Sequence, residues 1–425
     1  MPSITIKEIP YRIYEGLPLQ VRKFIRPILR IFSLSNIFSL TPQLRPSVFL
    51  LQGREKWGGE SLSILFVGDE NGVLFLSDFL YSGEPKKESL GKVFFWRIKS
   101  RMNLGPPRGD LVFVNMDGFF SRFLPRQQFM IIPAWILFML DLSKRFPESW
   151  NLSKSKNKSL RENLREFRRQ KYSYEIANDP GKFEYFYHHM YSPYITKRFE
   201  ELTFLAGFYG MKRVFRKGWL LLVKKGDDYV SGILLVRRSP DTIFAYALGI
   251  TEGNIEYVKK GALTAVYYFS ILWAKEKGYK WMDFGDCRSF LKDGVLNYKK
   301  HWGMEIKISR RFKNIFGIKI CNYCQAVQNF LEKNPFIFID QGKLKGLILF
   351  NKNHPVTLKE VQACVKTYYI PGLDCLVIIS HQGFDQEAKE FANSCSMPRV
   401  QPVNIKEENF QKDLTMLLNR ETAVV

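Results

Sequence analysis

One short stretch of the sequence carries residue types whose spacing favours binding chemistry. Lys259, Lys260, Gly261 and Ala262 stand where an apolar helical pattern begins. The free backbone N–H groups and the dipole at a helix N-terminus attract anions, and a glycine there lets a pyrophosphate approach the backbone. Two lysines strengthen that positive field. The stretch therefore predicts a binding turn for a phosphate-bearing molecule.

Other familiar chemistries are disfavoured by spacing. Cys321 and Cys324 form a single pair, and no second Cys or His pair stands nearby to complete a zinc site. We interpret them as buried thiols and expect no metal. The sequence has no Gly-x-Ser-x-Gly elbow, and its Asp283-Phe284-Gly285 is not preceded by the other kinase motifs. The sequence therefore disfavours a serine hydrolase and a kinase.

The elements around the phosphate turn follow from apolar runs and turn residues. Three strand patterns, GWLLLVKKG, DYVSGILLVRRS and DTIFAYALGI, are separated by short turns and predict an antiparallel meander. A helix is predicted from about Gly261 to Gly278, where glycine ends it. The segment YKWMDFGD then predicts a further strand, and LNYKKHWG another element. Helices are expected upstream, over residues 181–218.

This order resembles the GNAT acyltransferase superfamily, in particular its FemAB-like branch, to which the CelD-like acetyltransferases are also similar. The resemblance covers residues 150–310, and it is weaker over 45–150, which in the family often holds a second, degenerate copy of the fold. The residues that carry it are Gly232, Gly261-Ala262, Asp283-Phe284-Gly285, Gly294, Leu296, Tyr298-Lys299 and Trp302-Gly303.

The resemblance implies transfer of an acyl or aminoacyl group from a thioester or ester to an amine. The donor phosphates would bind the turn of Lys259, Lys260, Gly261 and Ala262. The acyl carbonyl would lie against backbone N–H groups of a splayed strand, residues 243–250, which includes Leu248.

The resemblance also implies a base to accept the amine proton. Asp283, Asp286, Tyr298 and His301 are the candidates, and Lys299, which aligns with a lysine of the family, would stabilise negative charge. Asp283, Tyr298 and Lys299 form the predicted catalytic set. The structural alternatives are a hydrogen-bonding role for Asp283, core packing for Tyr298 and an ordinary surface histidine for His301.

Charge is the main anomaly of the composition. The 425 residues carry a formal net charge of +23, which suits a polyanionic partner or an organism whose proteins are generally basic. Residues 154–171 are strongly basic, with an apolar stripe at Leu160, Leu164 and Phe167, and either a solvated helix face or an anion-binding face fits them. The basic, apolar residues 1–45 predict either a packed arm or an amphipathic helix on a membrane surface.

The composition and apolar patterns together predict an α/β (α+β) fold. The resemblance implies a mixed, mostly antiparallel GNAT-like sheet flanked by helices, in two related halves, and the apolar pattern after about residue 335 adds a small C-terminal α/β unit. In residues 46–150, a buried strand or a short strand-like unit is predicted for each of SVFLLQG, LSILFVG, GVLFLSDFL, KVFFWRI and DLVFVNM. The predicted domains are a basic arm (1–45), an N-terminal α/β domain (46–150), an acyltransferase domain (151–335) and a C-terminal module (336–425).

The leading hypothesis is an N-acyltransferase that uses acetyl-CoA or another acyl-CoA. The alternatives are an aminoacyl-tRNA-dependent transferase of FemAB type and a non-catalytic protein that binds nucleic acid or a membrane surface. The acceptor is an amine, whether a small molecule or lipid-linked. Six cysteines without regular spacing, and no secretory signal or span-length apolar run, predict a cytoplasmic location, with peripheral binding at the inner membrane face as a further expectation.

Overall fold

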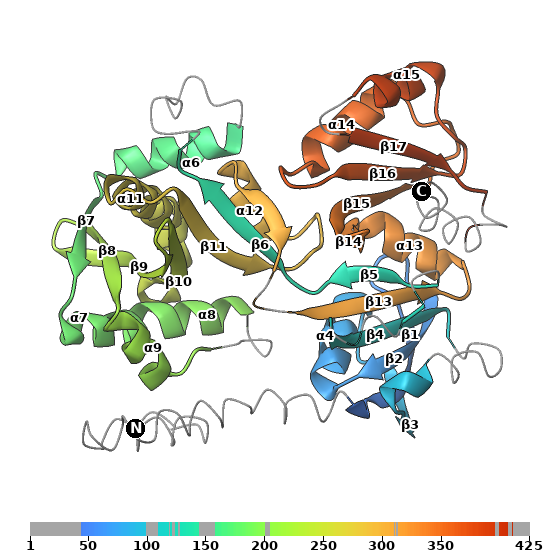
Figure 1. The fold of residues 1–425 in the computed structure, drawn as a ribbon, viewed down its shortest axis with the longest axis horizontal. Coiled ribbons are helices and arrows are strands. Elements are labelled where there is room, and N and C mark those ends of the chain that lie inside the picture. The colour runs from blue at the N-terminus through green and yellow to red at the C-terminus, as the bar shows by residue number, and fades with distance from the viewer. Residues whose placement is uncertain are drawn as a thin grey trace. The chain divides into compact units, whose positions relative to one another are not determined.

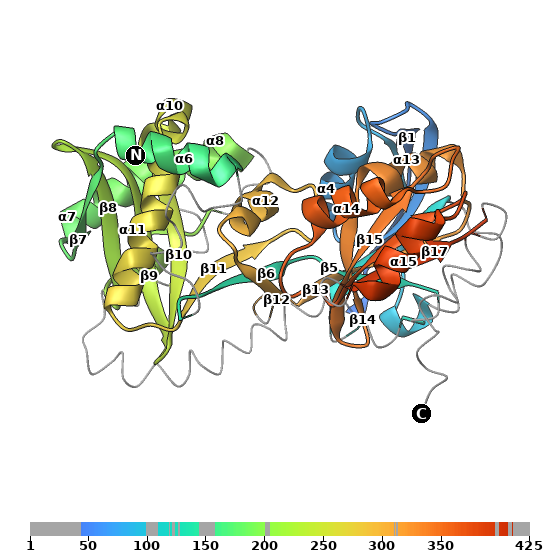
Figure 2. The same cartoon turned by 90° about the horizontal axis from the view of Figure 1, so that it is seen from above.

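The computed structural model describes residues 44–98, 109–118, 120, 124–125, 128–143, 158–199, 205–309, 311, 313–395, 399–406 and 410. They form a mixed α/β fold with two large mixed sheets flanked by helices, as Figures 1 and 2 show from two directions. Most of the strand pairs are antiparallel. The predicted fold class is thereby confirmed. The predicted arm lies outside the described residues, apart from its last two.

The chain divides into two compact units, each built from several chain segments. Of the described residues, the first unit contains those within 138–285 and 301–305, and the second contains those within 44–137, 286–300 and 306–410. Residues 286–300 and 306–335, which the sequence groups with the acyltransferase domain, thus belong to the second unit.

The first unit contains most of the seven-stranded sheet, whose strand order is β12-β6-β11-β10-β9-β8-β7; the start of β6, the end of β11 and all but the first residue of β12 are assigned to the second unit. α11 and α6 cover one face of its central strands, and α8, α9 and a π-helical turn (η5) cover the other (Figure 1). The predicted stripe of α6 is confirmed, because Leu160, Leu164 and Phe167 are buried. The strands are β6 (Ile136–Asp141), β7 (Ser173–Ala177), β8 (Gly218–Lys225), β9 (Asp228–Ser239), β10 (Thr242–Ile250), β11 (Trp281–Cys287) and β12 (Glu305–Ile308). The helices are α6 (Lys158–Arg169), α7 (Pro180–Tyr185), η5 (Phe186–Tyr191), α8 (Ser192–Phe199), α9 (Phe208–Phe215), η7 (Thr251–Gly253), α10 (Ile255–Lys259) and α11 (Ala262–Glu276).

The predicted meander is confirmed: β8, β9 and β10 pair antiparallel in sequence order. β11, which follows α11, returns parallel to β10. A strand pair, a crossover helix and a parallel strand therefore stand in the predicted order.

The second unit is built on a ten-stranded sheet with the order β17-β16-β15-β14-β5-β13-β4-β2-β1-β3. Alternate side chains of its strands face two separate apolar cores, as expected for strands covered on both faces: Phe49 and Leu51 enter one core and Val48 the other. Its strands are β1 (Ser47–Arg54), β2 (Ser61–Gly68), β3 (Lys86–Lys92), β4 (Leu111–Asp117), β5 (Met130–Pro133), β13 (Asn314–Ile320), β14 (Phe336–Asp340), β15 (Lys343–Phe350), β16 (Cys375–Ser380) and β17 (Arg399–Asn404).

Two of the five predicted strands in this unit are wrong. GVLFLSDFL lies within helix α4 (Glu70–Leu80), because Asp69 caps its N-terminus and its buried residues recur at helical spacing. KVFFWRI contributes only its first residue to β3, and the 3-10 helix η2 (Phe95–Arg97) follows.

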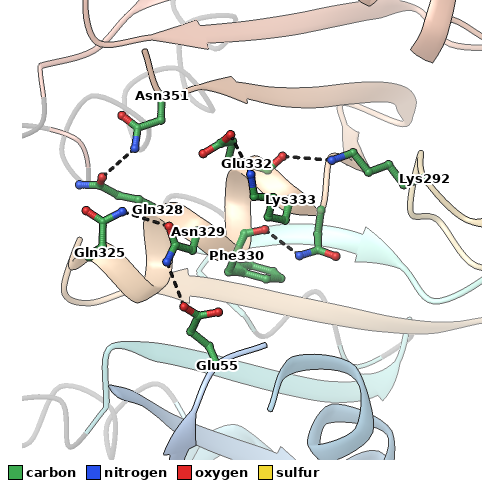
Figure 3. Close-up of polar contacts among 10 residues, drawn as sticks. Glu55, Lys292, Gln325, Gln328, Asn329, Phe330, Glu332, Lys333 and Asn351 are labelled. Atoms are coloured by element: carbon green, nitrogen blue, oxygen red, sulfur yellow. Dashed lines mark hydrogen bonds and ion pairs between the residues drawn. The ribbon is translucent and has the colours of Figure 1, made fainter. Parts of the chain in front are cut away.

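Helix α13 (Gln325–Lys333) connects chain segments of the second unit that are far apart in sequence (Figure 3). Asn329 Nδ2 donates to Glu55 Oε1 at 2.9 Å, and Gln328 Oε1 accepts from Asn351 Nδ2 at 3.1 Å. Glu55 is fully buried. The helix therefore ties the end of β1 to the residue after β15.

The predicted C-terminal β-α-β-α pattern is confirmed, with β14 and β17 as additional strands. β15, β16 and β17 are parallel, with α14 (Leu358–Tyr368) and α15 (Gln386–Ser394) between them in the chain. Both helices begin at side-chain caps, Thr357 and Asp385. Asp385 also accepts a hydrogen bond from Leu358 N at 3.3 Å, so one carboxylate serves the first turns of both helices.

Candidate active site

The N-terminus of α11 is the centre of the predicted donor site. Gly261 is its N-cap, with a left-handed backbone at φ +84°, and no side chain caps the helix. The first turn contains no acidic residue. Ser231 Oγ, from β9, donates to Ala262 O at 3.0 Å and fixes this turn to the sheet. The first backbone N–H groups of α11 have no partner within the helix, so the turn keeps its positive dipole end.

The predicted donor-binding residues do not contribute equally to this end. The backbone N–H groups of Lys260 and Gly261 donate to Glu256 O and Val258 O, which completes the short helix α10. Lys259 Nζ lies 2.7 Å from Glu256 Oε1 at the surface. The available donors of α11 therefore begin at Ala262, and the two lysines can act only through their side-chain charge.

Helix α6 lies directly against this corner. A Cβ atom on Gly261 would lie 3.1 Å from the backbone nitrogen of Phe167, so only glycine fits without displacement. Tyr172 Oη donates to Lys260 O at 3.1 Å. Burial, and to a smaller extent the Glu166 carboxylate, raises the pKa of Tyr172 to about 12, so the phenol stays a donor. The predicted turn is thus held from one side by α6, whose exposed residues include Arg165 and Arg168.

The second unit repeats the chain order of this region with a different helix end. β1 and β2 pair antiparallel, α4 follows β2, and β4 returns parallel to β2. In α4, however, Asp69 Oδ1 accepts from Gly72 N at 2.8 Å, and Glu70 stands in the first turn. The Asp69 carboxylate thus occupies the position where an anion would bind. Of the two related helix ends, α11 is the one without such a carboxylate.

β10 and β11 diverge beside the start of α11. Their parallel pairing covers only Thr242–Phe244 with Trp281–Asp283. The pairing of β10 with β9 shifts between Ala245 and Ala247, which makes Tyr246 the extra residue of a bulge. Leu248, predicted in the donor site, lies in this diverging half of β10, opposite Ile233 of β9. Backbone groups on the β11 side of this half are not used by a β10–β11 ladder.

Asp283 lies at the last paired position before the divergence, and its carboxylate is engaged. Arg238 Nη1 lies 2.5 Å from Oδ2, and Gly285 N donates to Oδ1 at 2.8 Å. The side chain is 1% exposed. Such contacts hold the strand in position, and a proton-accepting role for Asp283 stays a prediction.

The other predicted catalytic residues, Tyr298 and Lys299, belong to the second unit, on helix α12 (Gly294–His301). Lys299 is buried, and its Nζ donates to Asp286 O at 3.3 Å. Asp286 Oδ2 in turn lies 2.8 Å from Arg311 Nη2, and the carboxylate is 3% exposed. Burial, opposed by the nearby Lys299 charge, raises the pKa of the neighbouring Cys287 thiol to about 12. Lys299, Asp286 and Arg311 therefore form one largely buried polar group.

Two findings concern metal ligands and membrane-spanning helices in the part of the chain that the structure describes. Within it, no three His, Cys, Asp or Glu side chains gather as metal ligands. Cys321 and Cys324 are partly buried free thiols, and burial raises the pKa of each. No described helix has the length and apolar character needed to cross a bilayer.

Three residues that the sequence does not single out contact predicted site residues within their own unit. Arg238 holds Asp283, Arg311 holds Asp286, and Ser231 anchors the first turn of α11. Their partners are 45, 25 and 31 residues away in sequence. No local sequence pattern links residues so far apart. The pairing of Arg238 with Asp283 could be predicted only from the register of their strands, which the sequence alone does not give.

Comparison with known proteins gives matches to solved structures alone: no family model and no curated protein matches the chain. The neighbours include the structure of L-PGS from Bacillus licheniformis (12% identity, TM-score 0.34, covering 63% of this chain and 80% of that one). They also include FemX, with 12% identity and a TM-score of 0.33, covering 63% of this chain and 83% of that one. A tandem GNAT protein from the clavulanic acid biosynthesis pathway has 10% identity and a TM-score of 0.28, covering 63% of this chain and 81% of that one. Similarity at these TM-scores does not establish a family.

Proposed function

We propose that this protein is an N-acyltransferase that transfers an acyl group, acetyl in the simplest case, from acyl-CoA to an amine. The observation that carries the proposal is the N-terminus of α11. It is capped by Gly261, has no carboxylate in its first turn and follows a strand that diverges from its parallel neighbour. The pyrophosphate of the donor would accept hydrogen bonds from the first-turn amides of α11.

The proposed reaction needs mainly positioning and stabilisation of charge. The amine nitrogen attacks the thioester carbon, the carbonyl oxygen becomes an oxyanion, and the C–S bond then breaks to release the CoA thiol. Backbone N–H groups in the diverging half of β10, which includes Leu248, would stabilise the oxyanion. A base removes the proton from the amine, and Asp283, Tyr298 and Lys299 remain the proposed catalytic residues.

A second candidate, an aminoacyl-tRNA donor, is favoured by one observation. Helix α6 packs against Gly261 and carries exposed arginines, and a basic helix next to the turn suits a longer polyanion than CoA. A non-catalytic polyanion-binding protein would use the same face. Location in the cytoplasm and an amine acceptor, whether a small molecule or lipid-linked, belong to the proposal as well.

Calorimetry with CoA and acetyl-CoA tests the donor site on two variants of one residue. Leu263 lies in the first turn of α11, so Leu263→Glu introduces a carboxylate where the phosphate would bind, and Leu263→Gln is the neutral control of equal size. A Gly261 variant is less suitable, since its backbone is left-handed and crowded by Phe167. We expect the Glu variant to bind acetyl-CoA at least about tenfold more weakly than the Gln variant. Equal affinities would contradict the proposed turn.

Catalysis is tested separately by the release of CoA thiol from acetyl-CoA in the presence of a panel of amines. Thiol release that requires both the amine and the protein supports an acyltransferase. Absence of both acetyl-CoA binding and turnover would contradict the leading proposal, and the aminoacyl donor is then tested with aminoacyl-tRNA. Binding of RNA that weakens steeply with salt, without affinity for acetyl-CoA, would favour the non-catalytic alternative.

A further inference from the structure

An exposed aromatic and basic surface lies at one edge of the ten-stranded sheet of the second unit. Phe94 and Trp96 stack on each other with ring centroids 4.7 Å apart, and their side chains are 37% and 54% exposed. The Arg45 guanidinium lies over the Phe94 ring, 5.2 Å from its centroid. We call the residues of this surface the docking patch: Leu44, Arg45, Lys92, Phe94, Trp96 and Arg97.

The backbone fixes the two chain segments of the docking patch to each other. Ser47 of β1 pairs with Lys92 of the edge strand β3, and Val93 N donates to Pro46 O at 3.0 Å. Val93 is buried beneath, while the residues on either side of it point outward. The aromatic rings are therefore presented on an ordered support rather than on a chain end.

The charge of the docking patch selects its partner. Its two segments, residues 44–46 and 92–98, contain three basic residues and no acidic residue. A second copy of this chain, at +23, has the same sign. So does the preceding sequence, since residues 1–43 contain six Lys and Arg against two Glu. The complementary partner is an anionic surface.

A phospholipid membrane fits the docking patch better than nucleic acid. Phe94 already contacts Trp96 and Arg45, whereas stacking on bases needs open ring faces. The two segments contain no Asn, Gln, Ser or Thr to read bases, and they include an exposed aliphatic side chain, Leu44. Trp and Phe flanked by Lys and Arg are the side chains that enter the headgroup region of an anionic bilayer.

We propose that the docking patch binds this protein peripherally to membranes that contain anionic phospholipid, with Trp96 inserted at the headgroup level. Membrane binding by the docking patch does not depend on whether the protein is an acyltransferase.

The test is co-sedimentation of the full-length protein with vesicles of phosphatidylcholine alone or mixed with phosphatidylglycerol. We expect binding to the mixed vesicles and loss of binding in high salt. Arg45→Gln should lower the partition coefficient about fivefold, and Trp96→Ala about tenfold. Leu74→Ala, which removes another exposed apolar side chain, 60% exposed on α4, is the matched control and should bind as the wild type does.

A spectroscopic measurement shows which side chain enters the bilayer. Brominated lipids should quench the tryptophan fluorescence of the wild type, and Trp96→Phe should remove that part of the quenching while leaving the melting temperature unchanged. Equal binding to both vesicle types would overturn the proposal. Unchanged vesicle binding by Trp96→Ala would overturn it as well. Binding of polyuridylate to the docking patch, together with no binding to either vesicle type, would identify an RNA-binding surface instead.

Discussion

The Arg238 guanidinium and the Asp283 carboxylate form an ion pair of 2.5 Å at the point where β10 and β11 diverge. The Asp283 side chain is 1% exposed and that of Arg238 is 37% exposed, so the ion pair connects a buried carboxylate to a partly exposed guanidinium. Replacing Arg238 by Met should leave a buried charge without this cation and lower the free energy of unfolding by about 3 kcal/mol.

Urea unfolding of Arg238→Met, Asp283→Asn and the double variant measures this coupling. We expect the double variant to be more stable than the sum of the two single changes implies. Strict additivity would show that the pair contributes no interaction energy.

Two glycines with left-handed backbone bound α11, and their surroundings differ. Gly278 has φ +78° and open space where a Cβ atom would lie, whereas Gly261 has φ +84° and the Phe167 backbone within 3.1 Å of that position. Gly278→Ala should cost about 1 kcal/mol of stability from backbone strain alone. Gly261→Ala should cost at least about 2 kcal/mol, because crowding by α6 adds to the strain. Thermal unfolding of both variants checks the difference, and equal costs would argue against close packing of α6.

Glu55 is a fully buried carboxylate that accepts hydrogen bonds from Asn329 Nδ2 (Figure 3) and from the backbone N–H groups of Trp57, Gly58 and Glu60. Burial acts to raise its pKa, but these hydrogen bonds outweigh burial and lower it. Glu55→Gln places an amide donor against other donors and should cost about 2 kcal/mol at neutral pH.

Denaturant unfolding measures the effect of Glu55→Gln. Glu332→Gln, a surface change on α13, is the control and should stay within about 0.5 kcal/mol of the wild type. A Glu55→Gln protein as stable as this control would mean that the donors around Glu55 are satisfied in some other way.

The stability of the C-terminal part of the second unit should depend on pH through the Glu360 carboxylate. Burial acts to raise its pKa, yet hydrogen bonds from Lys352 and from the backbone and hydroxyl of Thr357 lower it to about 2. Because the folded-state pKa lies below the ordinary value, the stabilisation is present above about pH 4.5 and is lost as the pH falls towards 2.

Glu360→Gln removes this contribution, so its stability should be lower by about 1 kcal/mol at pH 7 and should depend less on pH between 5 and 3. Urea unfolding at a series of pH values tests this, with Glu387→Gln on α15 as the control. A variant with an unchanged pH profile would contradict the role of the capping box.

Most helices and strands of the fold can be predicted from the regular spacing of apolar residues in the sequence. The meander, α11 and the C-terminal strand–helix alternation follow from apolar spacing and turn residues, and the structure has all of them. The helix α4 was missed because its apolar residues are nearly continuous, so strand and helix periods fit equally well. Asp69, a capping residue just before the run, was the local sign of a helix.

The candidate site could be predicted only where it depends on one chain segment. Gly261 and the start of α11 are local features, so sequence sufficed to find them. The contact of α6 with Gly261 and the ion pair of Asp283 with Arg238 depend on packing between distant segments. A single sequence does not specify which of its many arginines meets a given aspartate.

The division of both units into several chain segments determines when, during synthesis, each unit has all of its residues. Residues 301–305 complete the first unit, yet they follow a stretch that belongs to the second, and the second unit takes up the chain again from residue 306. Neither unit is a contiguous segment of the gene, so no single cut yields one of them whole. The first unit therefore cannot complete its fold until residues 301–305 have been synthesised, and by then much of the second unit has been synthesised as well.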